Sequence, residues 1–235
     1  MSYLKVLFSV MFVLPTVLCT GQYITYAADP SRDRIEMFWK DDRGNIFETI
    51  NNLKKWLDGR GRRLLFATNG GMFMEDLSPL GLYVENGKLL RGLNLRNGNT
   101  NFYIKPQGVF CVTKDHKAFI CRADAYSQSG NIEFATQSAP MLVINGTVNA
   151  ALRAFGKSKL IRSGVGIRPD SCVVFALSEY PVTFIEFARY FLSLKCTDAM
   201  FLDGSISEMY LPEKNLDDCP GSFGVIIAVT RQAKK

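Results

Sequence analysis

Histidine is nearly absent from this sequence. His116 is the only histidine in 235 residues, and it lies in the polar stretch TKDHKA, which is typical of an exposed turn. A Ser-His-Asp triad, a Cys-His pair and a histidine-rich metal site are therefore disfavoured. Any chemistry must come from carboxylates, amides, hydroxyls, arginine and backbone N–H groups.

The cysteines lack the spacing of a metal site. The sequence has 6 cysteines, without a C-x-x-C and with no spacing that suits zinc. An odd number remains if Cys19 is removed with the N-terminus. Cys111 and Cys121 flank a predicted hairpin, and Cys196 and Cys219 bracket a later loop. One or two disulfides are compatible with an oxidising compartment, with at least one thiol left over.

Long apolar runs are confined to the N-terminus. Lys5 is followed by the apolar run VLFSVMFVLPTVL and then by Cys19-Thr20-Gly21. This order predicts a signal peptide over residues 1–21, and hence a secreted or periplasmic protein. A membrane anchor is the alternative, but the run is short and polar residues follow it at once. No other segment could span a bilayer, so no stable membrane span is expected after cleavage.

Clustered basic patches and repeats are also missing. The net charge is +6, but the lysines and arginines are scattered without interleaved aromatic residues. A nucleic-acid partner is therefore not expected, whereas a basic surface suits anionic substrates. Hydrophobic residues make up 47% of the chain, enough for the core of one domain, which we place at residues 22–235.

Hairpin signals dominate the element pattern. Asn86-Gly87 and Asn145-Gly146 predict tight turns between short strands. Few helices are expected: one at about residues 48–58, and one in TFIEFARYFLSLK, where Thr183 and Glu186 form a capping box. The fold class is therefore α+β, with a mainly antiparallel, hairpin-rich sheet and a few packed helices in a single domain.

Three polar or glycine-rich breaks follow or interrupt predicted buried strands. They are Asn69-Gly70-Gly71, the segment IRSGVG, and Asp203-Gly204-Ser205. Strand ends join a rigid scaffold to a loop and are suited to holding a reacting group. Taken singly, each break is better explained as a tight turn with a hydrogen-bonding Asn or Asp.

Taken in order, these segments resemble the phosphodiester glycosidase family. The resemblance runs from about Leu64 to Val229, and its four segments are ATNGGMF, TQSAPMLVINGTVN, RSGVGI and DAMFLDGS. The last segment departs from the family pattern, because many members continue Asp-Gly-Gly-Gly-Ser where this chain has Asp203-Gly204-Ser205-Ile206-Ser207. The order of four motifs is more specific than any one of them.

The resemblance implies a hydrolase that cleaves a sugar from the phosphate on its anomeric carbon, in a glycan or exopolysaccharide. A phosphate leaving group is a weak base, so strong acid assistance matters less and histidine can be missing. The partner is then a phosphorylated glycan or sugar-phosphate diester. No cofactor and no metal are expected.

The same resemblance suggests roles for individual residues. Asp203 is the expected catalytic carboxylate, Arg162 the phosphate ligand and Asn69 a positioning group. Backbone N–H groups at Gly70-Gly71 and Gly204-Ser205 are expected to form an anion-holding concavity. Glu208 and Glu75 are candidates for a second carboxylate. Further substrate contacts are expected at Gln137, Ser138, Ser163, Gly166, Ser207 and Glu208.

Two alternatives from other classes remain open. The chain could be a secreted glycan-binding or envelope-assembly module that kept the fold without the catalysis. Alternatively, Asp203, Glu208 and Asp217 or Asp218 could hold a structural Ca²⁺, although their spacing matches no EF-hand.

Overall fold

The computed structural model describes residues 22–155, 157–203 and 206–233. Within these ranges the chain forms 15 strands and only two α-helices, and every strand pairing is antiparallel. The predicted fold class, a single α+β domain with mainly antiparallel sheets, is confirmed. The predicted signal peptide at residues 1–21 lies outside the described residues.

The strands form three sheets. A 6-stranded sheet has the order β1 (Tyr23–Ala28), β12 (Val173–Ser178), β11 (Ser163–Ile167), β13 (Asp198–Phe201), β9 (Met141–Ile144), β10 (Thr147–Val148). A 4-stranded sheet has the order β14 (Met209–Tyr210), β3 (Arg62–Asn69), β15 (Ile226–Gln232), β2 (Arg34–Phe38). A 5-stranded sheet has the order β5 (Lys88–Arg91), β4 (Tyr83–Glu85), β8 (Ile132–Ser138), β6 (Gly108–Thr113), β7 (Ala118–Arg122).

Both predicted helices are present and begin at capping residues. Helix α1 (Ile50–Asp58) starts after Thr49, whose hydroxyl accepts a hydrogen bond from the backbone N–H of Asn52 at 3.1 Å. Helix α2 (Phe184–Ser193) has the predicted capping box, with Thr183 and Glu186 each accepting from the other's backbone N–H. Short 3₁₀ helices are η1 (Asn101–Tyr103), η2 (Ala123–Ala125), η3 (Ala150–Phe155) and η4 (Pro212–Lys214).

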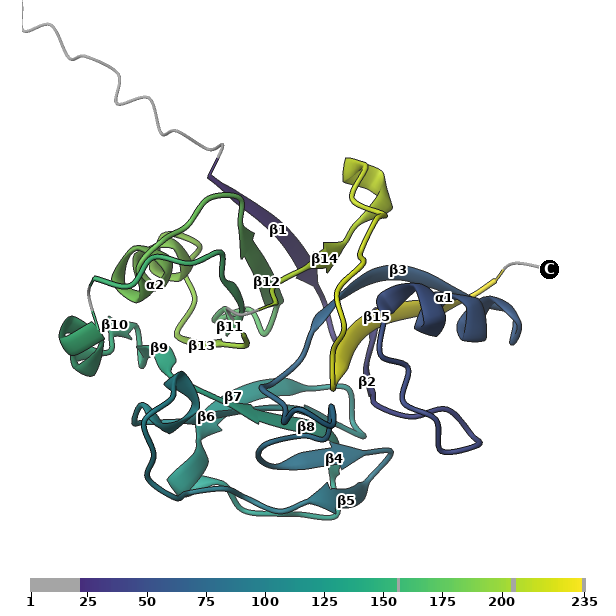
Figure 1. The fold of residues 1–235 in the computed structure, drawn as a ribbon, viewed down its shortest axis with the longest axis horizontal. Helices are drawn as coiled ribbons and strands as arrows, with labels where there is room; N and C mark the ends of the chain where they lie inside the picture. The colour runs from purple at the N-terminus through teal and green to yellow at the C-terminus, as the bar shows by residue number, and fades with distance from the viewer. Residues whose placement is uncertain (1–21, 156, 204–205, 234–235) are drawn as a thin grey trace, which may run out of the picture.

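The helices cover the outer faces of two different sheets (Figure 1). Helix α1 buries Ile50, Leu53 and Leu57 against the 4-stranded sheet. Helix α2 packs on the 6-stranded sheet, where a Cβ on Gly166 would lie 2.7 Å from the ring of Phe191. A third cluster, which includes Phe66, Phe110 and Phe175 from the three sheets, fills the space between them.

The turns behave as the sequence predicts. Asn86 and Gly87 have φ values of 50° and 76°, and Asn145 and Gly146 have φ values of 47° and 72°. Both pairs connect neighbouring antiparallel strands, β4 with β5 and β9 with β10. These left-handed conformations explain the Asn-Gly sequence, since both residues adopt positive φ at low cost.

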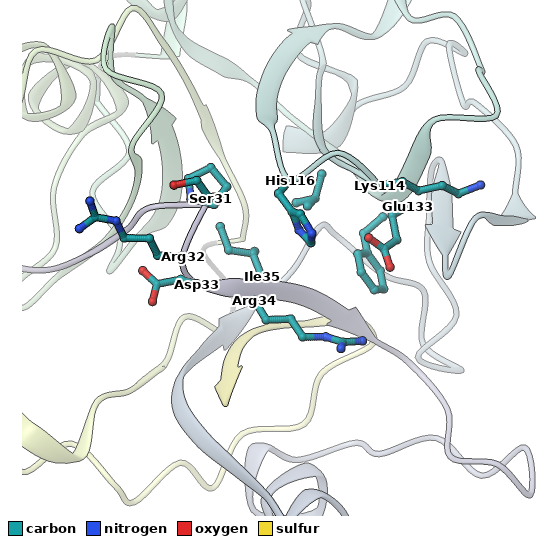
Figure 2. Close-up of a pocket in the computed structure, with 11 residues that line it drawn as sticks. Ser31, Arg32, Asp33, Arg34, Ile35, Lys114, His116 and Glu133 are labelled. Carbon is teal, nitrogen blue, oxygen red and sulfur yellow. The ribbon is translucent and has the colours of Figure 1, made fainter. Parts of the chain in front are cut away.

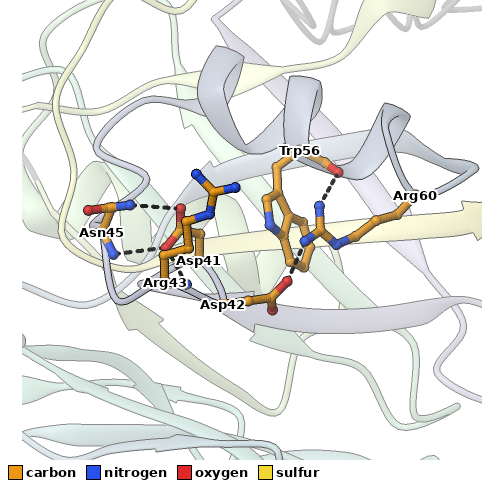
Figure 3. A network of polar contacts seen from close by, with 6 residues as sticks. All are labelled: Asp41, Asp42, Arg43, Asn45, Trp56 and Arg60. Carbon is orange, nitrogen blue, oxygen red and sulfur yellow. Dashed lines mark hydrogen bonds and ion pairs between the residues drawn. The ribbon is translucent and has the colours of Figure 1, made fainter.

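A polar network joins the segment after β2 to the end of α1 (Figure 3). The Asp41 carboxylate closes its own turn by accepting from the backbone and side-chain N–H groups of Asn45, at 2.8 and 3.1 Å. Arg60 pairs with Asp42, and its guanidinium lies 3.8 Å from the ring centroid of Trp56. The network holds the connection against the helix at the edge of the domain.

The five cysteines in the described part of the chain all carry free thiols. The predicted hairpin between Cys111 and Cys121 is present as β6–β7, but Cys111 pairs with Phe119 and Cys121 pairs with Val109. The disulfides that the sequence allows are therefore not formed in this structure. Across the described residues, no helix is long and apolar enough to cross a membrane.

Candidate functional site

The three polar breaks converge where the three sheets meet. Asn69 ends β3 of the 4-stranded sheet, and Ser138 ends β8 of the 5-stranded sheet. Ser163 begins β11 of the 6-stranded sheet, and Asp203 follows β13 in the same sheet. Four segments far apart in sequence thus bring their polar ends to one place, as expected if these ends form a site.

Asn69 and Ser163 form the centre of this cluster. The side-chain amide of Asn69 donates to the hydroxyl of Ser163 at 2.8 Å, and that hydroxyl donates to the backbone carbonyl of Asp203 at 3.1 Å. Asn69 and Ser163 are buried, and Asp203 is 8% exposed. The hydrogen bonds therefore fix the position of the Asp203 backbone from two other strands.

The chain departs from regular pairing immediately before Asp203. Ser163 accepts from the backbone N–H of Leu202 at 3.0 Å but donates its own N–H to the carbonyl of Asp203 at 3.3 Å. Two residues thus oppose one, which is the signature of a β-bulge, a feature that often redirects a side chain next to an active site. Ser138 stabilises the bulge by donating its hydroxyl to the Leu202 carbonyl at 2.6 Å.

The segment after Asp203 folds back onto the same cluster. The hydroxyl of Ser207 donates to the Asp203 carbonyl and lies 3.4 Å from the hydroxyl of Ser163. The backbone N–H of Glu208 donates to Asn69 Oδ1 at 3.4 Å, and the Glu208 carbonyl accepts from Thr68 Oγ1 at 2.8 Å. The predicted residues Asn69, Ser163, Asp203, Ser207 and Glu208 are therefore brought together.

Glu208 places a carboxyl group of altered acidity beside the cluster. Both of its carboxylate oxygens accept from the backbone N–H of Gly221, at 3.0 and 3.1 Å. Burial raises the pKa of Glu208 above its ordinary 4.5, against the lowering effect of the Gly221 hydrogen bond, and nearby Asp218 raises it further. A Cβ on Gly221 would lie 2.9 Å from Glu208 Oε1, so a side chain at this position would displace the Glu208 carboxyl group.

The backbone N–H groups of Gly70 and Gly71 do not form the predicted anion-holding concavity. Gly70 donates to the carbonyl of Val225 at 2.7 Å, and Gly71 donates to Thr136 Oγ1 at 3.3 Å. Both donors are thus already bonded within the protein. The other half of the predicted concavity, Gly204-Ser205, lies outside the described residues.

Gln137 and Gly166, two further residues that were expected to contact substrate, have structural roles. The Gln137 amide accepts from the backbone N–H groups of Leu82 and Asn94, at 2.9 and 3.0 Å, and donates to the Asn94 carbonyl at 2.8 Å. Its polar atoms are therefore occupied in joining loops. Gly166 lies beneath Phe191 of α2, where no substrate can reach it. Sequence position alone could not separate these residues from Asn69 and Ser163.

Arg162 directly precedes β11, and its side chain packs towards α2 rather than towards Asn69. Its guanidinium is fully buried, 3.7 Å from the ring centroid of Phe184. Nε donates to the carbonyl of Val182 at 2.8 Å, and one terminal nitrogen donates to that of Ser158 at 2.9 Å. The two-pronged phosphate contact predicted for Arg162 is therefore wrong for this conformation.

The Arg162 charge is nevertheless unusual. Its Nη1 is the one buried side-chain nitrogen or oxygen without a hydrogen-bond partner in the described part of the chain. Burial lowers the pKa of this guanidinium to about 10, which leaves it charged at neutral pH. This positive charge is carried by the residue directly before Ser163.

The remaining carboxylate candidates are not part of a metal site. Glu75 is exposed, and it lies in the loop after β3 rather than in the cluster. Within the described ranges, no three His, Cys, Asp or Glu side chains are close enough to hold a metal ion. The calcium alternative, which requires Asp203, Glu208 and Asp217 or Asp218 together, gains no support from this arrangement.

Sequence reasoning missed two residues that shape the cluster. Thr68 holds the Glu208 backbone, and Gly221 holds the Glu208 carboxyl. Thr68 directly precedes the Asn-Gly-Gly segment, so its position beside that motif could have identified it as part of the site. Gly221 lies in a loop before β15 with no pattern of its own, and only the fold brings it to Glu208.

A separate cleft of about 280 Å³ lies away from this cluster (Figure 2). It is at the other end of the 4-stranded sheet, since Arg34 pairs with Thr230 whereas Asn69 pairs with Ile226. Figure 2 shows its polar lining on two sides: Arg32, Asp33 and Arg34 on one, and Lys114, His116 and Glu133 on the other. None of the motifs that define the candidate site reaches this cleft.

Comparison with known proteins identifies the family. A family model described as phosphodiester glycosidase matches residues 62–226, which include Asn69, Ser163 and Asp203. The chain belongs to the phosphodiester glycosidase family. Within it, the chain is 40% identical over 187 residues to the uncharacterized protein YigE of Escherichia coli, covering 79% of this chain and 73% of YigE.

Solved structures show that the fold is also that of the family. The catalytic domain of zebrafish N-acetylglucosamine-1-phosphodiester alpha-N-acetylglucosaminidase, auto-inhibited by its pro-peptide, matches with a TM-score of 0.59 at 16% identity, over 89% of this chain and 88% of that one. A putative exported protein of Burkholderia pseudomallei matches with a TM-score of 0.58 at 13% identity, over 88% and 73%. A hypothetical protein from Synechocystis has a TM-score of 0.59 at 13% identity, over 90% and 60%.

Proposed function

We propose that this phosphodiester glycosidase family member hydrolyses the bond between a sugar and the phosphate on its anomeric carbon. The observation that carries this proposal is the convergence of Asn69, Ser163 and the segment from Asp203 to Glu208 at the junction of three sheets. Family membership supplies the reaction class, and the cluster supplies the groups that the reaction needs.

Asp203 is the carboxylate that activates water or attacks the anomeric carbon. Its backbone is held by Ser163 and Ser207, so the carboxylate is carried on a fixed segment rather than a free loop. The bulge at Leu202 directs the chain out of the sheet at this point. Such fixation favours catalysis, because a reacting group gains most when its geometry is set in advance.

Glu208 assists the departing phosphate by donating a proton. Burial raises its pKa, which keeps more of the acid form available towards neutral pH. The phosphate is itself a good leaving group, so this assistance contributes less than it would for an alcohol. The hydrogen bond from Gly221 holds the carboxyl group in one orientation.

Arg162 acts on the phosphate through its charge rather than through a direct fork of hydrogen bonds. Two of its nitrogens are committed to the carbonyls of Val182 and Ser158. No acidic group lowers or raises its pKa, and burial alone accounts for the shift. An uncompensated cation in low-dielectric surroundings stabilises negative charge that develops in front of it.

The reaction would take place outside the cytoplasm. The N-terminal pattern over residues 1–21 is that of a signal peptide, and the substrate would then be an extracellular or periplasmic glycan phosphate. Exopolysaccharides that carry sugar phosphate diesters fit this description. The scattered positive charge of the chain favours approach of such anionic polymers.

A release assay tests this proposal. The purified protein is incubated with N-acetylglucosamine joined through phosphate to methyl mannoside, and with a small panel of other glycosyl phosphate diesters, while NMR follows the free sugar. Asp203→Asn is the test variant, with an expected loss of about a hundredfold or more. Asp198→Asn, at the other end of the same strand, is the matched control and should retain activity.

Two results would count against the proposal. Equal activity in the Asp203→Asn variant would remove Asp203 from the mechanism. No release from any diester by folded protein, combined with glycan binding that survives Asp203→Asn, would favour the alternative of a non-catalytic glycan-binding module.

A further inference from the structure

Four leucines are exposed within one short segment, from Lys88 to Arg96. Leu89, Leu90, Leu93 and Leu95 have exposed fractions of 53, 47, 37 and 46%. We call these four residues the leucine surface. Single exposed leucines are common, but four within seven positions of one segment require an explanation.

The segment is held firmly, so the exposure does not result from a loose loop. Asn94 is buried at its centre, where its backbone N–H and carbonyl both bond to the Gln137 amide at 3.0 and 2.8 Å. The Lys105 ammonium donates to the carbonyls of Leu95 and Arg96, at 2.9 and 3.3 Å. These buried anchors fix the backbone while the leucines on either side point outward.

The first two leucines lie on an edge strand. β5 pairs with β4 and ends the 5-stranded sheet. Leu90 is the extra residue of a β-bulge, since Val84 pairs with Leu89 and Tyr83 pairs with Arg91, so the alternation of side chains between faces is interrupted here. Leu89 and Leu90 are both exposed. Neither face of this edge is covered by the described part of the chain.

Positive charge surrounds the leucines. Lys88, Arg91 and Arg96 lie within the segment, which contains no acidic residue. These three cations form no salt bridge with any described residue. One acidic residue lies close to the segment: Glu85 pairs with Lys88 across β4 and β5, accepts from the Tyr83 hydroxyl at 2.7 Å, and has a pKa that burial raises. Exposed leucines with cations in the same segment suit a partner that is both apolar and anionic.

An amphipathic aromatic residue lies beside the same surface. The Lys40 ammonium lies 3.9 Å from the Trp39 ring centroid. A hollow beside the leucine surface is lined by Trp39, Lys40, Glu85, Asn86, Lys88 and Leu90. Trp39 is half-buried and donates its indole N–H to the Leu77 carbonyl at 3.0 Å. Tryptophan, lysine and arginine around an apolar patch are typical of residues at a membrane interface.

We propose that the leucine surface docks the protein on a lipid bilayer that carries anionic headgroups. The leucines enter the headgroup boundary, while Lys88, Arg91 and Arg96 pair with lipid phosphates. A soluble polyanion would not account for the leucines, and a neutral protein groove would not account for the cations. The inference is independent of the proposed reaction.

Docking would place the candidate site close to the membrane. Gln137 anchors the segment through Asn94, and the next residue, Ser138, bonds to the carbonyl of Leu202 at 2.6 Å. The leucine surface and the Asn69–Ser163 cluster are thus joined through two adjacent residues at the end of β8.

Vesicle binding with a local fluorescence probe tests the proposal. The full chain carries two tryptophans, so a Trp56→Phe background leaves Trp39 as the reporter beside Leu90. Vesicles of phosphatidylcholine, with and without phosphatidylglycerol, contain lipids brominated near the headgroup, which quench only nearby tryptophan. This local signal separates the leucine surface from the apolar N-terminus.

We expect Trp39 quenching with phosphatidylglycerol vesicles and little with phosphatidylcholine alone. Leu89→Ser with Leu90→Ser should weaken the quenching signal about tenfold or more, because two leucines no longer leave water. The matched control is Phe119→Ser, an exposed apolar residue on β7, the opposite edge of the same sheet. This control should bind as the parent does, and circular dichroism melts confirm that each variant is folded.

Three results would overturn the proposal. The first is vesicle binding without Trp39 quenching, which would place the contact elsewhere. The second is quenching that is unchanged by the two leucine substitutions or equal on neutral vesicles. The third is a dimer in light scattering that Leu89→Ser with Leu90→Ser dissociates, which would make this edge a self-association surface.

Discussion

The side-chain amide of Asn69 donates a 2.8 Å hydrogen bond to the hydroxyl of Ser163, across a sequence separation of 94 residues. Asn69 ends a strand of one sheet, and Ser163 begins a strand of another. Both side chains are buried. This bond joins two sheets at the position where Asp203 leaves the second of them.

Removing the hydroxyl of Ser163 should weaken both the fold and the activity. Ser163→Ala leaves the Asn69 amide with a single acceptor, the Gly70 carbonyl at 3.5 Å. An unsatisfied buried donor costs about 1–3 kcal/mol in the free energy of unfolding. Urea denaturation measures this loss, with Ser193→Ala as the control because its hydroxyl is exposed. A stability loss equal to that of the control would contradict the role given to Ser163.

Glycine at position 71 is required by close packing. A Cβ there would lie 2.3 Å from the Gln137 carbonyl oxygen and 2.6 Å from Thr136 Oγ1. Gly71→Ala must therefore push the segment after β3 away from β8, and we expect a destabilisation of about 2 kcal/mol or more. Gly130→Ala is the matched control, since no atom lies within 4 Å of its added Cβ. Similar melting temperatures for the two variants would refute this packing argument.

The charge of Arg162 and its hydrogen bonds can be separated by two substitutions. Arg162→Lys keeps the charge, whereas Arg162→Met removes it, and both leave the carbonyls of Val182 and Ser158 without their present donors. We expect both to lose about 2–4 kcal/mol of stability. If charge supports catalysis, only the methionine variant should also lose most of its kcat at a temperature where both are folded. Equal kcat values would show that Arg162 is purely structural.

Activity should depend on the protonation of Glu208. Burial raises its pKa above 4.5, and the proposed acid must be protonated. Activity should therefore fall as pH rises through this raised pKa. Glu208→Gln cannot donate a proton from a carboxyl group, so its remaining activity should lack that fall. A pH profile of kcat/KM for both proteins provides the measurement, and identical profiles would exclude Glu208 as the acid.

The raised pKa of Glu208 also makes the free energy of unfolding depend on pH. The folded protein binds the Glu208 proton more tightly than the unfolded chain does, so the contribution is fully present below pH 4.5 and is lost as pH rises through the raised pKa. Glu208→Gln should therefore gain stability relative to the parent as pH increases. A constant difference between pH 4 and 8 would contradict the sign of this shift.

Much of the fold was predictable because its signals are local. The capping box at Thr183 and Glu186 involves residues three apart, and the Asn-Gly turns need only two adjacent residues. Such features depend only on residues close in sequence and need no long-range contact. The helices, the hairpins and the fold class follow from them.

The site was only partly predictable, because it depends on long-range pairing. The motifs identified Asn69, Ser163 and Asp203, yet their hydrogen bonds arise where three sheets meet. Arg162 packs on Phe184 of α2 whereas Ser163 bonds to Asn69, so adjacent residues of one motif contact different layers. Glutamine is a residue type that often binds sugars, but the side-chain amide of Gln137 is already hydrogen-bonded to Leu82 and Asn94. No single-sequence pattern distinguishes these outcomes.

Hydrolysis of a glycosyl phosphate diester in ¹⁸O-labelled water tests the central claim most directly. Cleavage between the anomeric carbon and oxygen places the label in the released sugar and leaves the phosphate monoester unlabelled, as this account predicts for a glycosidase acting through Asp203. Label found in the phosphate instead would mean that water attacks phosphorus, and would contradict the account.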